Sequence, residues 1–124
     1  MTIDYDKLSK QIIDFDPQVR FAGVANSKGK LVAGGQRDNT EKLLDDNDAR
    51  MSIHYGFKKR EFYTNLAYKL GHETSSITEF EKVTMITIPI NSQELFLIST
   101  EPRADYLKII GHVRSMLDTQ RDSE

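Results

Sequence analysis

Residues 83–100 read VTMITIPINSQELFLIST. The stretch holds two runs of β-branched and other apolar residues, 83–90 and 94–100, separated by the polar triplet at 91–93. Runs of this length with a short polar spacer are typical of two strands joined by a hairpin turn. A connection this short can join only antiparallel strands, so the stretch predicts an antiparallel sheet.

Further strands are expected upstream, at 19–25, 31–36 and 75–81. The first two flank a polar, glycine-containing turn and predict a second hairpin. Gly34-Gly35 lies in the second strand of that hairpin. Because glycine weakens a central strand, this pair favours an edge position, a bulge or a close backbone approach.

Helical patterns surround the strands. Apolar residues recur at helical spacing near both ends of the chain, which predicts helices over 4–15 and 105–117. Between the two hairpins we expect a short helical piece at 41–45 and a long helix at 47–70, ended by Gly71. The order α-β-β-α-β-β-β-α predicts an α+β fold, with a five-stranded antiparallel sheet and helices on both faces.

The length of 124 residues suits one domain with a modest core, so 1–124 is expected to form a single domain. The tail 118–124 is polar and lacks apolar periodicity, so we expect it to be frayed. The strongest apolar runs supply the expected core, which consists of Ile86, Ile88, Phe96, Ile98, Ile110 and Val113.

The composition excludes several classes of function. The net charge of −2 and the pI of about 5.9 give no general attraction to nucleic acid or anionic lipid. The absence of cysteine excludes disulfide scaffolds, thiolate metal ligands and cysteine nucleophiles. The N-terminus lacks a signal-peptide pattern, and no apolar run reaches the length of a membrane span. We therefore expect a cytoplasmic protein that does not insert into membranes.

Two loops resemble ligand motifs but fail on spacing. Gly23 and Gly29 are separated by five residues and followed by Lys30-Leu31, whereas a phosphate-binding loop needs four residues and then Lys-Ser/Thr. The acidic run at 45–48 lacks the central glycine and terminal glutamate of a calcium loop. We interpret the first as a hairpin turn and the second as a helix N-cap.

No catalytic, cofactor-binding or metal-ligating residue is assigned, and no cofactor is expected. The three histidines, His54, His72 and His112, fall on separate elements, and no serine lies in a Gly-x-Ser-x-Gly motif. The basic run 58–60 is interpreted as a solvated helix face rather than a nucleic-acid site, because Glu61 adjoins it and the chain is acidic overall. We therefore expect no enzyme.

The expected long helix is apolar over most of its circumference. On a helical wheel of residues 49–70, polar side chains gather on one narrow stripe, and apolar ones surround nearly all the rest. A helix packed on a single sheet needs an apolar stripe of only about 100°. Either the terminal helix, a folded-back segment or a partner chain must cover the remainder.

We predict that a second copy of the chain covers it. The dimer would form through the long helix and the strand at 31–36, whose edge presents unpaired N–H and C=O groups. The predicted interface residues are Leu31, Ala33, Gly34, Gly35, Met51, Tyr55, Phe62 and Leu66.

Three stretches resemble parts of the Roadblock (dynein light chain) family. Residues 21–32 (FAGVANSKGKLV) resemble the first hairpin of the family, and residues 84–100 resemble its last hairpin. Residues 104–110 (ADYLKII) resemble the start of its terminal helix. The order of elements matches over almost the whole chain, although the 40–70 region is longer than the family pattern. The pattern also resembles small archaeal proteins of unknown function. Profilin-like and longin-like domains share the layout, but the N-terminal helix favours Roadblock.

The resemblance implies a non-catalytic homodimeric scaffold that regulates or holds small GTPases, or that attaches cargo to motors. Two alternatives stay open. One is a small-ligand sensor with a pocket between the sheet and the long helix, lined by Tyr55, Phe62 and Tyr63. The other is an unrecognised enzyme, since carboxylates that pair through space are invisible in a sequence.

Overall fold

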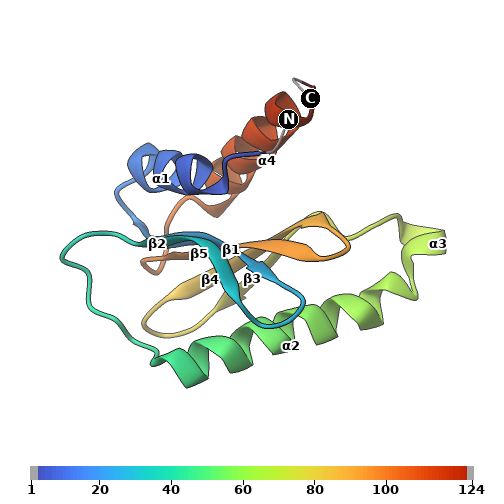
Figure 1. Ribbon diagram of the computed structural model, residues 1–124, viewed down its shortest axis with the longest axis horizontal. Coiled ribbons are helices and arrows are strands. Elements are labelled where there is room, and N and C mark those ends of the chain that lie inside the picture. The colour runs from blue at the N-terminus through green and yellow to red at the C-terminus, as the bar shows by residue number, and fades with distance from the viewer. Residues whose placement is uncertain (1–2, 123–124) are drawn as a thin grey trace.

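The computed structural model describes residues 3–122, and within them it shows one five-stranded antiparallel sheet with helices on both faces (Figure 1). The predicted α+β class and the order of the main elements are confirmed. The elements are α1 (Tyr5–Phe15), β1 (Val19–Asn26), β2 (Leu31–Gln36), α2 (Asp46–Thr64), α3 (Ala67–Leu70), β3 (Ser76–Glu79), β4 (Thr84–Asn91), β5 (Glu94–Thr100) and α4 (Tyr106–Asp122).

The strand order in the sheet is β2-β1-β5-β4-β3. Both predicted hairpins are present, and the last strand, β5, lies in the centre between β1 and β4. Phe96 of β5 is aligned with Val24 of β1 on one side and with Ile88 of β4 on the other. The predicted edge position of β2 is confirmed, and β3 forms the opposite edge.

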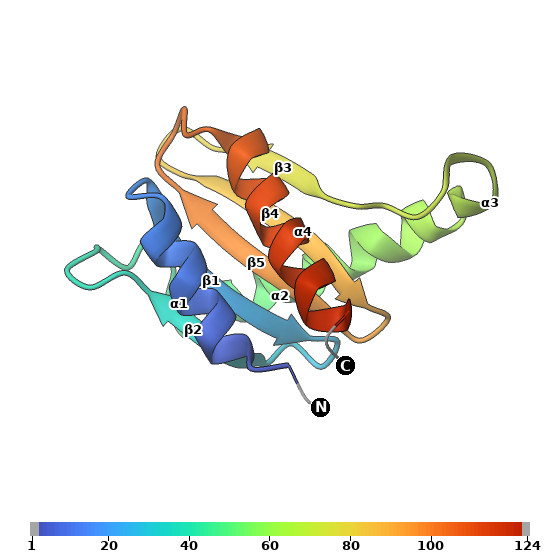
Figure 2. The ribbon, with the colours of Figure 1, turned by 90° about the horizontal axis from the view of Figure 1, so that it is seen from above.

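The hydrophobic core lies between the sheet and the pair α1 and α4, which cover the same face (Figure 2). All six residues predicted to form the core belong to it, and each is at most 5% exposed. Leu8 and Ile12 of α1 and Ile109 and Leu117 of α4 complete this layer.

Helix α1 has defined ends. The Asp4 side chain accepts a hydrogen bond from the Lys7 N–H at 3.1 Å, which caps the N-terminus. Asp16, which precedes Pro17, is extended and ends the helix as predicted. The Arg37 guanidinium donates to the carbonyls of Ile13 and Asp16, near the helix end, and to that of Val19.

The region between the hairpins differs from the prediction. No helix forms at 41–45, because the carbonyls at its start are bonded elsewhere: Gln36 Nε2 donates to the carbonyls of Thr40 and Glu41 at 2.9 and 2.8 Å. The predicted capping role of the acidic run is confirmed, since Asp45 accepts from the Asp48 N–H at 2.8 Å and starts α2.

The predicted continuous helix at 47–70 is interrupted. It ends at Thr64, where the Asn65 and Leu66 N–H groups donate to carbonyls three residues back and tighten the chain. The short α3 follows and ends at Gly71, whose φ of +82° suits a glycine after a helix.

The terminal helix is longer than predicted. Residues 118–122 belong to α4, in which the buried Leu117 lies one turn beyond Val113, and fraying of this end stays a prediction. Residues 123–124 of the predicted tail lie outside the described part of the chain.

Candidate functional site

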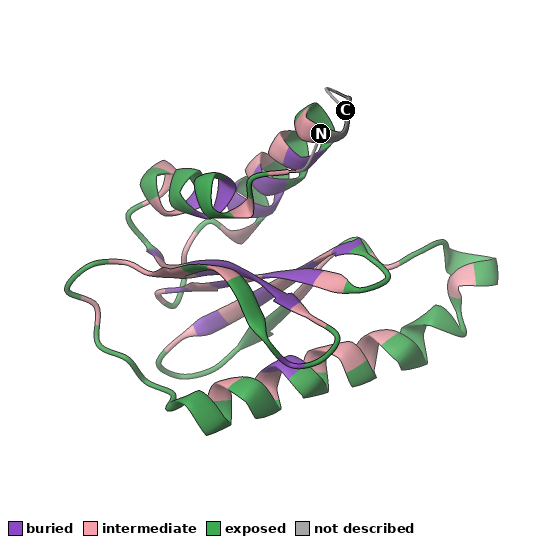
Figure 3. Cartoon of the chain, in the orientation of Figure 1, coloured by how far each residue is buried: buried purple, intermediate pink, exposed green. Residues whose placement is uncertain are grey.

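The two faces of the sheet are covered to different extents (Figure 3). In β4, residues 84, 86, 88 and 90 are buried, whereas the residues that alternate with them are only half-buried. Among the nineteen residues of α2, all of which the structure describes, Ile53 is the one that is buried. Helix α2 therefore covers its face of the sheet incompletely.

A cavity of about 350 Å³ lies between this face of the sheet and the first half of α2. Phe21, Met85 and Leu97 line it from the sheet, and Ala49 and Ile53 line it from the helix. Leu43 and Leu44, each 40% exposed, belong to the lining from the segment that leads into α2. The walls are mostly apolar.

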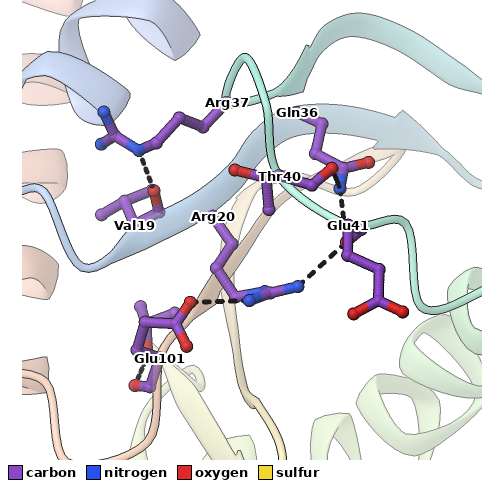
Figure 4. Close-up of polar contacts among 8 residues, drawn as sticks. Val19, Arg20, Gln36, Arg37, Thr40, Glu41 and Glu101 are labelled. Carbon is purple, nitrogen blue, oxygen red and sulfur yellow. Dashed lines mark hydrogen bonds and ion pairs between the residues drawn. The ribbon is translucent and has the colours of Figure 1, made fainter.

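Polar side chains are fixed at one end of the cavity (Figure 4). Arg20 Nη1 forms an ion pair with Glu101 Oε2 at 2.6 Å, and Arg20 Nη2 donates to the Glu41 carbonyl at 2.9 Å. The Arg20 side chain is only 15% exposed. Together with Gln36, it ties the segment 40–41 to the sheet and fixes this end of the cavity.

A second ion pair lies where this segment enters α2. Lys42 Nζ contacts Asp46 Oδ1 at 2.8 Å on the surface. The hydrogen bond and the opposite charge raise the pKa of Lys42 and lower the pKa of Asp46. Both groups are therefore charged and paired at neutral pH.

The alternative of a pocket between the sheet and the long helix named side chains that do not line this cavity. Tyr55, Phe62 and Tyr63 are 73%, 69% and 48% exposed and do not line the cavity. Small residues of α2 face the sheet instead: a Cβ added to Gly56 would lie 3.7 Å from Leu95 Cδ1. The bulky aromatic residues consequently point away from the sheet.

The α2 residues of the predicted interface share an exposed face. Met51, Tyr55 and Phe62 are 63%, 73% and 69% exposed, whereas Leu66, 46% exposed, lies beyond the end of α2 in the turn before α3. The first three, spaced by four and seven residues, lie on one side of the helix. We call these three residues the α2 outer face.

The β2 residues of the predicted interface are partly engaged within the chain. Leu31 is 46% exposed, but the Gly34 N–H donates to Asp6 Oδ1 of α1 at 2.9 Å. That hydrogen bond already satisfies one donor of the β2 edge. Sequence reasoning missed the opposite edge, where Ile77 and Phe80 are 39% and 53% exposed in and next to the short strand β3.

The basic run at 58–60 is not a uniformly solvated helix face. Lys58 is exposed, but Lys59 Nζ donates to Ser76 Oγ at 2.6 Å. Arg60 turns into a polar cavity of about 270 Å³ shared with His72 and Glu73, and its Nη1 has no acceptor among the described residues. Burial lowers the pKa of Arg60, although the nearby Glu73 opposes this effect.

The three histidines lie apart from one another. His54 contacts the turn at Gly29, His112 stacks on Phe15 with ring centroids 3.7 Å apart, and His72 borders the polar cavity. Within residues 3–122, no group of three or more histidines or acids is placed to hold a metal ion. That same part of the chain contains no helix long and apolar enough to cross a membrane.

Comparisons with known proteins show the family and the fold. The pattern of a family of unknown function, DUF6659, matches residues 2–122. None of the curated proteins compared matches the sequence.

Three solved structures share the fold. A Roadblock/LC7 domain from Streptomyces avermitilis has a TM-score of 0.71 at 12% identity, covering 98% of both chains. The gliding protein MglB from Thermus thermophilus has a TM-score of 0.70 at 12% identity, covering 90% of this chain and 80% of that one. Profilin from Schizosaccharomyces pombe has a TM-score of 0.60 at 8% identity, covering 97% of this chain and 98% of that one. The expected Roadblock/profilin-like fold is therefore shown.

Proposed function

The chain belongs to the DUF6659 family, a family of unknown function, and we propose that it is a non-catalytic homodimeric interaction module that regulates a small GTPase. Its fold is that of Roadblock domains. The GTPase part of the proposal comes from the Roadblock resemblance of the sequence.

The observation that carries the dimer is the exposure of the α2 outer face. Tyr55 and Phe62 are more exposed than most large apolar residues of the described chain, and they lie together on one helix. Exposed aromatic residues on one side of a helix are typical of protein interfaces, in which buried aromatic residues supply much of the binding energy.

The charges along this face also suit a two-fold dimer. Asp48 and Lys58 are separated by ten residues and lie on the same side of α2 as Tyr55. A two-fold axis across the helix pairs it with its copy in antiparallel orientation. Asp48 of each copy would then lie near Lys58 of the other, with Met51 near Tyr55 between them.

Edge pairing between sheets would extend this interface. The predicted residues Leu31, Ala33, Gly34 and Gly35 lie on the β2 edge, and the capped Gly34 N–H leaves fewer free donors there. The β2 contribution therefore stays a prediction, and the proposal stands on α2.

The turn between β1 and β2 supports the absence of nucleotide chemistry. Asn26 Oδ1 accepts hydrogen bonds from the Lys28 and Lys30 N–H groups at 3.0 and 3.1 Å. These amides are occupied within the turn and cannot surround a phosphate as the amides of a phosphate-binding loop do. Calorimetric titration with ATP and GTP should show no binding in the micromolar range, and no hydrolysis should be measurable.

Light scattering coupled to size exclusion tests the dimer. The unmodified protein should have twice the 14.2 kDa mass of one chain, and Tyr55→Asp should be monomeric because dimerisation would bury an unpaired charge. Leu107→Asp makes a comparable change at a residue of α4 that is 79% exposed, and it should stay dimeric.

A monomer of unmodified protein at concentrations of tens of micromolar would refute the dimer. A charge swap tests the antiparallel arrangement: Asp48→Lys or Lys58→Asp alone should weaken the dimer, and the double variant should restore it. The regulatory role is tested by capture from native lysate, where the expected partner is a small GTPase. A reproducible set of partners without any GTPase would contradict that role and leave the dimer standing.

A further inference from the structure

We propose that the cavity between α2 and the sheet binds a small, mainly apolar molecule that carries no negative charge. Its volume of about 350 Å³ falls within the range of ligand pockets. This site is distinct from the α2 outer face, which points the opposite way, although Leu31 of the predicted β2 interface also lines it.

The apolar character of the ligand follows from the walls. Phe21, Met85 and Leu97 provide the surface on the sheet side, and Ile53 opposes them from α2. Apolar surface left in water is unfavourable, so a molecule that covers these side chains gains binding free energy in proportion to the area it buries.

The absence of negative charge on the ligand follows from the ion pairs that the basic residues of the cavity form. Arg20 is bonded to Glu101 and to the Glu41 carbonyl, and Lys42 is paired with Asp46. The basic groups that line the cavity are thus already neutralised by acids of the chain. An anionic ligand would lose its hydration without gaining a free counter-charge, and it would meet the Glu41 carboxylate, which lines the cavity without an ion-pair partner among the described residues.

The ligand is also expected to carry a neutral hydrogen-bonding group. Ser52, Thr87 and Ser99 line the cavity, and the structure of residues 3–122 shows no hydrogen bond from any of their hydroxyls. A few polar groups in an otherwise apolar wall are the usual means by which such pockets orient a ligand. A hydroxyl or carbonyl group on the ligand would match them.

The segment 41–45 is placed to cover the bound molecule. It is held at one end by Arg20 and Gln36, which bond the Glu41 carbonyl, and at the other by Asp45, which caps α2. Leu43 and Leu44 lie between these anchors and keep exposed apolar surface beside the cavity. A bound molecule would bury part of that surface.

Two dyes with the same aromatic skeleton provide the test. N-phenyl-1-naphthylamine is neutral, and 8-anilino-1-naphthalenesulfonate adds a sulfonate to the same rings. The neutral dye should show saturable fluorescence enhancement, and the dissociation constant of the anionic dye should be larger by at least about tenfold.

Variants locate the bound dye. Ala49→Phe and Ser52→Phe each place a ring in the cavity from α2, and either should abolish binding of the neutral dye. Gly111→Phe adds the same bulk on α4 at a site where an added Cβ meets no atom within 4 Å, and it should bind like the unmodified protein. Circular dichroism and the melting temperature identify any variant that fails to fold. Because Ala49→Phe and Ser52→Phe fill the cavity independently, one folded variant is enough for the test.

The dimer and the ligand site fail separately in this design. Tyr55→Asp should still bind the neutral dye, whether or not it is monomeric. Equal affinity for both dyes, no saturable binding, or binding that survives both fillings would overturn the proposal. So would loss of the dye as the protein concentration rises, because a second copy of the chain would then occupy the cavity.

Discussion

Replacing Arg37 by methionine should weaken the fold well beyond the loss of an ordinary surface charge. Its guanidinium lies between the end of β2 and the end of α1, and it donates to the carbonyls of Ile13, Asp16 and Val19. The Ile13 carbonyl belongs to the last turn of α1, where carbonyls lack partners within the helix. One side chain therefore satisfies three backbone acceptors.

The expected size follows from these contacts. A hydrogen bond that involves a charged group contributes about 1.5–3 kcal/mol to stability. The contributions do not add fully, because the carbonyls are only partly buried and water can replace some of the lost bonds. We expect Arg37→Met to lower the free energy of unfolding by about 3 kcal/mol, and Arg37→Lys by about half as much, since lysine keeps the charge but not the planar fork.

Urea unfolding followed by circular dichroism measures the change, with an unchanged slope as evidence that the unfolded state is the same. Arg114→Met, at an exposed position of α4, provides the control and should change the free energy by less than about 0.5 kcal/mol. If Arg37→Met behaved like Arg114→Met, the guanidinium would not hold α1 to β2 as described.

Three further predictions concern the core, the β2 edge and pH. Ile110→Ala should cost about 2–5 kcal/mol because the side chain is 5% exposed, and an unchanged urea midpoint would mean that α4 is not docked. Gly34→Ala should lower the melting temperature, whereas Gly35→Ala should not, because φ at Gly34 is +92° and an added Cβ would lie 2.2 Å from the Ala22 carbonyl oxygen. Burial lowers the pKa of His112 from its ordinary value of 6.5, so the unfolded chain binds the proton more tightly than the folded chain. The free energy of unfolding should therefore fall as the pH drops below 6.5. Urea midpoints measured at several pH values should show a smaller fall for His112→Gln than for the unmodified protein.

The sheet was predictable because its local signals agree with one another. The run at 83–100 combines β-branched residues with a polar turn, and its alternate residues Ile86 and Ile88 are buried as the period of two requires. The place of β5 beside β1 is different, since no local signal in the sequence specifies which hairpins join. That contact depends on packing between Val24, Phe96 and the helices above them.

The region around α2 was harder to predict because its structure depends on distant residues. The segment 41–45 is not helical since Arg20 and Gln36 bond the Glu41 carbonyl, and neither contact leaves a trace in the local pattern. Apolar periodicity also could not show which side of α2 meets the sheet. Ala49 and Gly56 were the available signal: small residues at helical spacing mark a side that approaches another element closely.

The strands β2 and β3 lie at opposite edges, so the chain between them must cross beneath the whole sheet. With strands about 4.8 Å apart, the crossing spans about 19 Å. The connection between β2 and β3 is held at its two ends and buries little surface in between. It can therefore open while all five strands stay paired. Its amide hydrogens should therefore exchange through local opening, whereas those of β4 and β5 exchange only when the whole domain unfolds. Substitutions on the surface of this connection can consequently accumulate in evolution with little effect on the stability of the sheet.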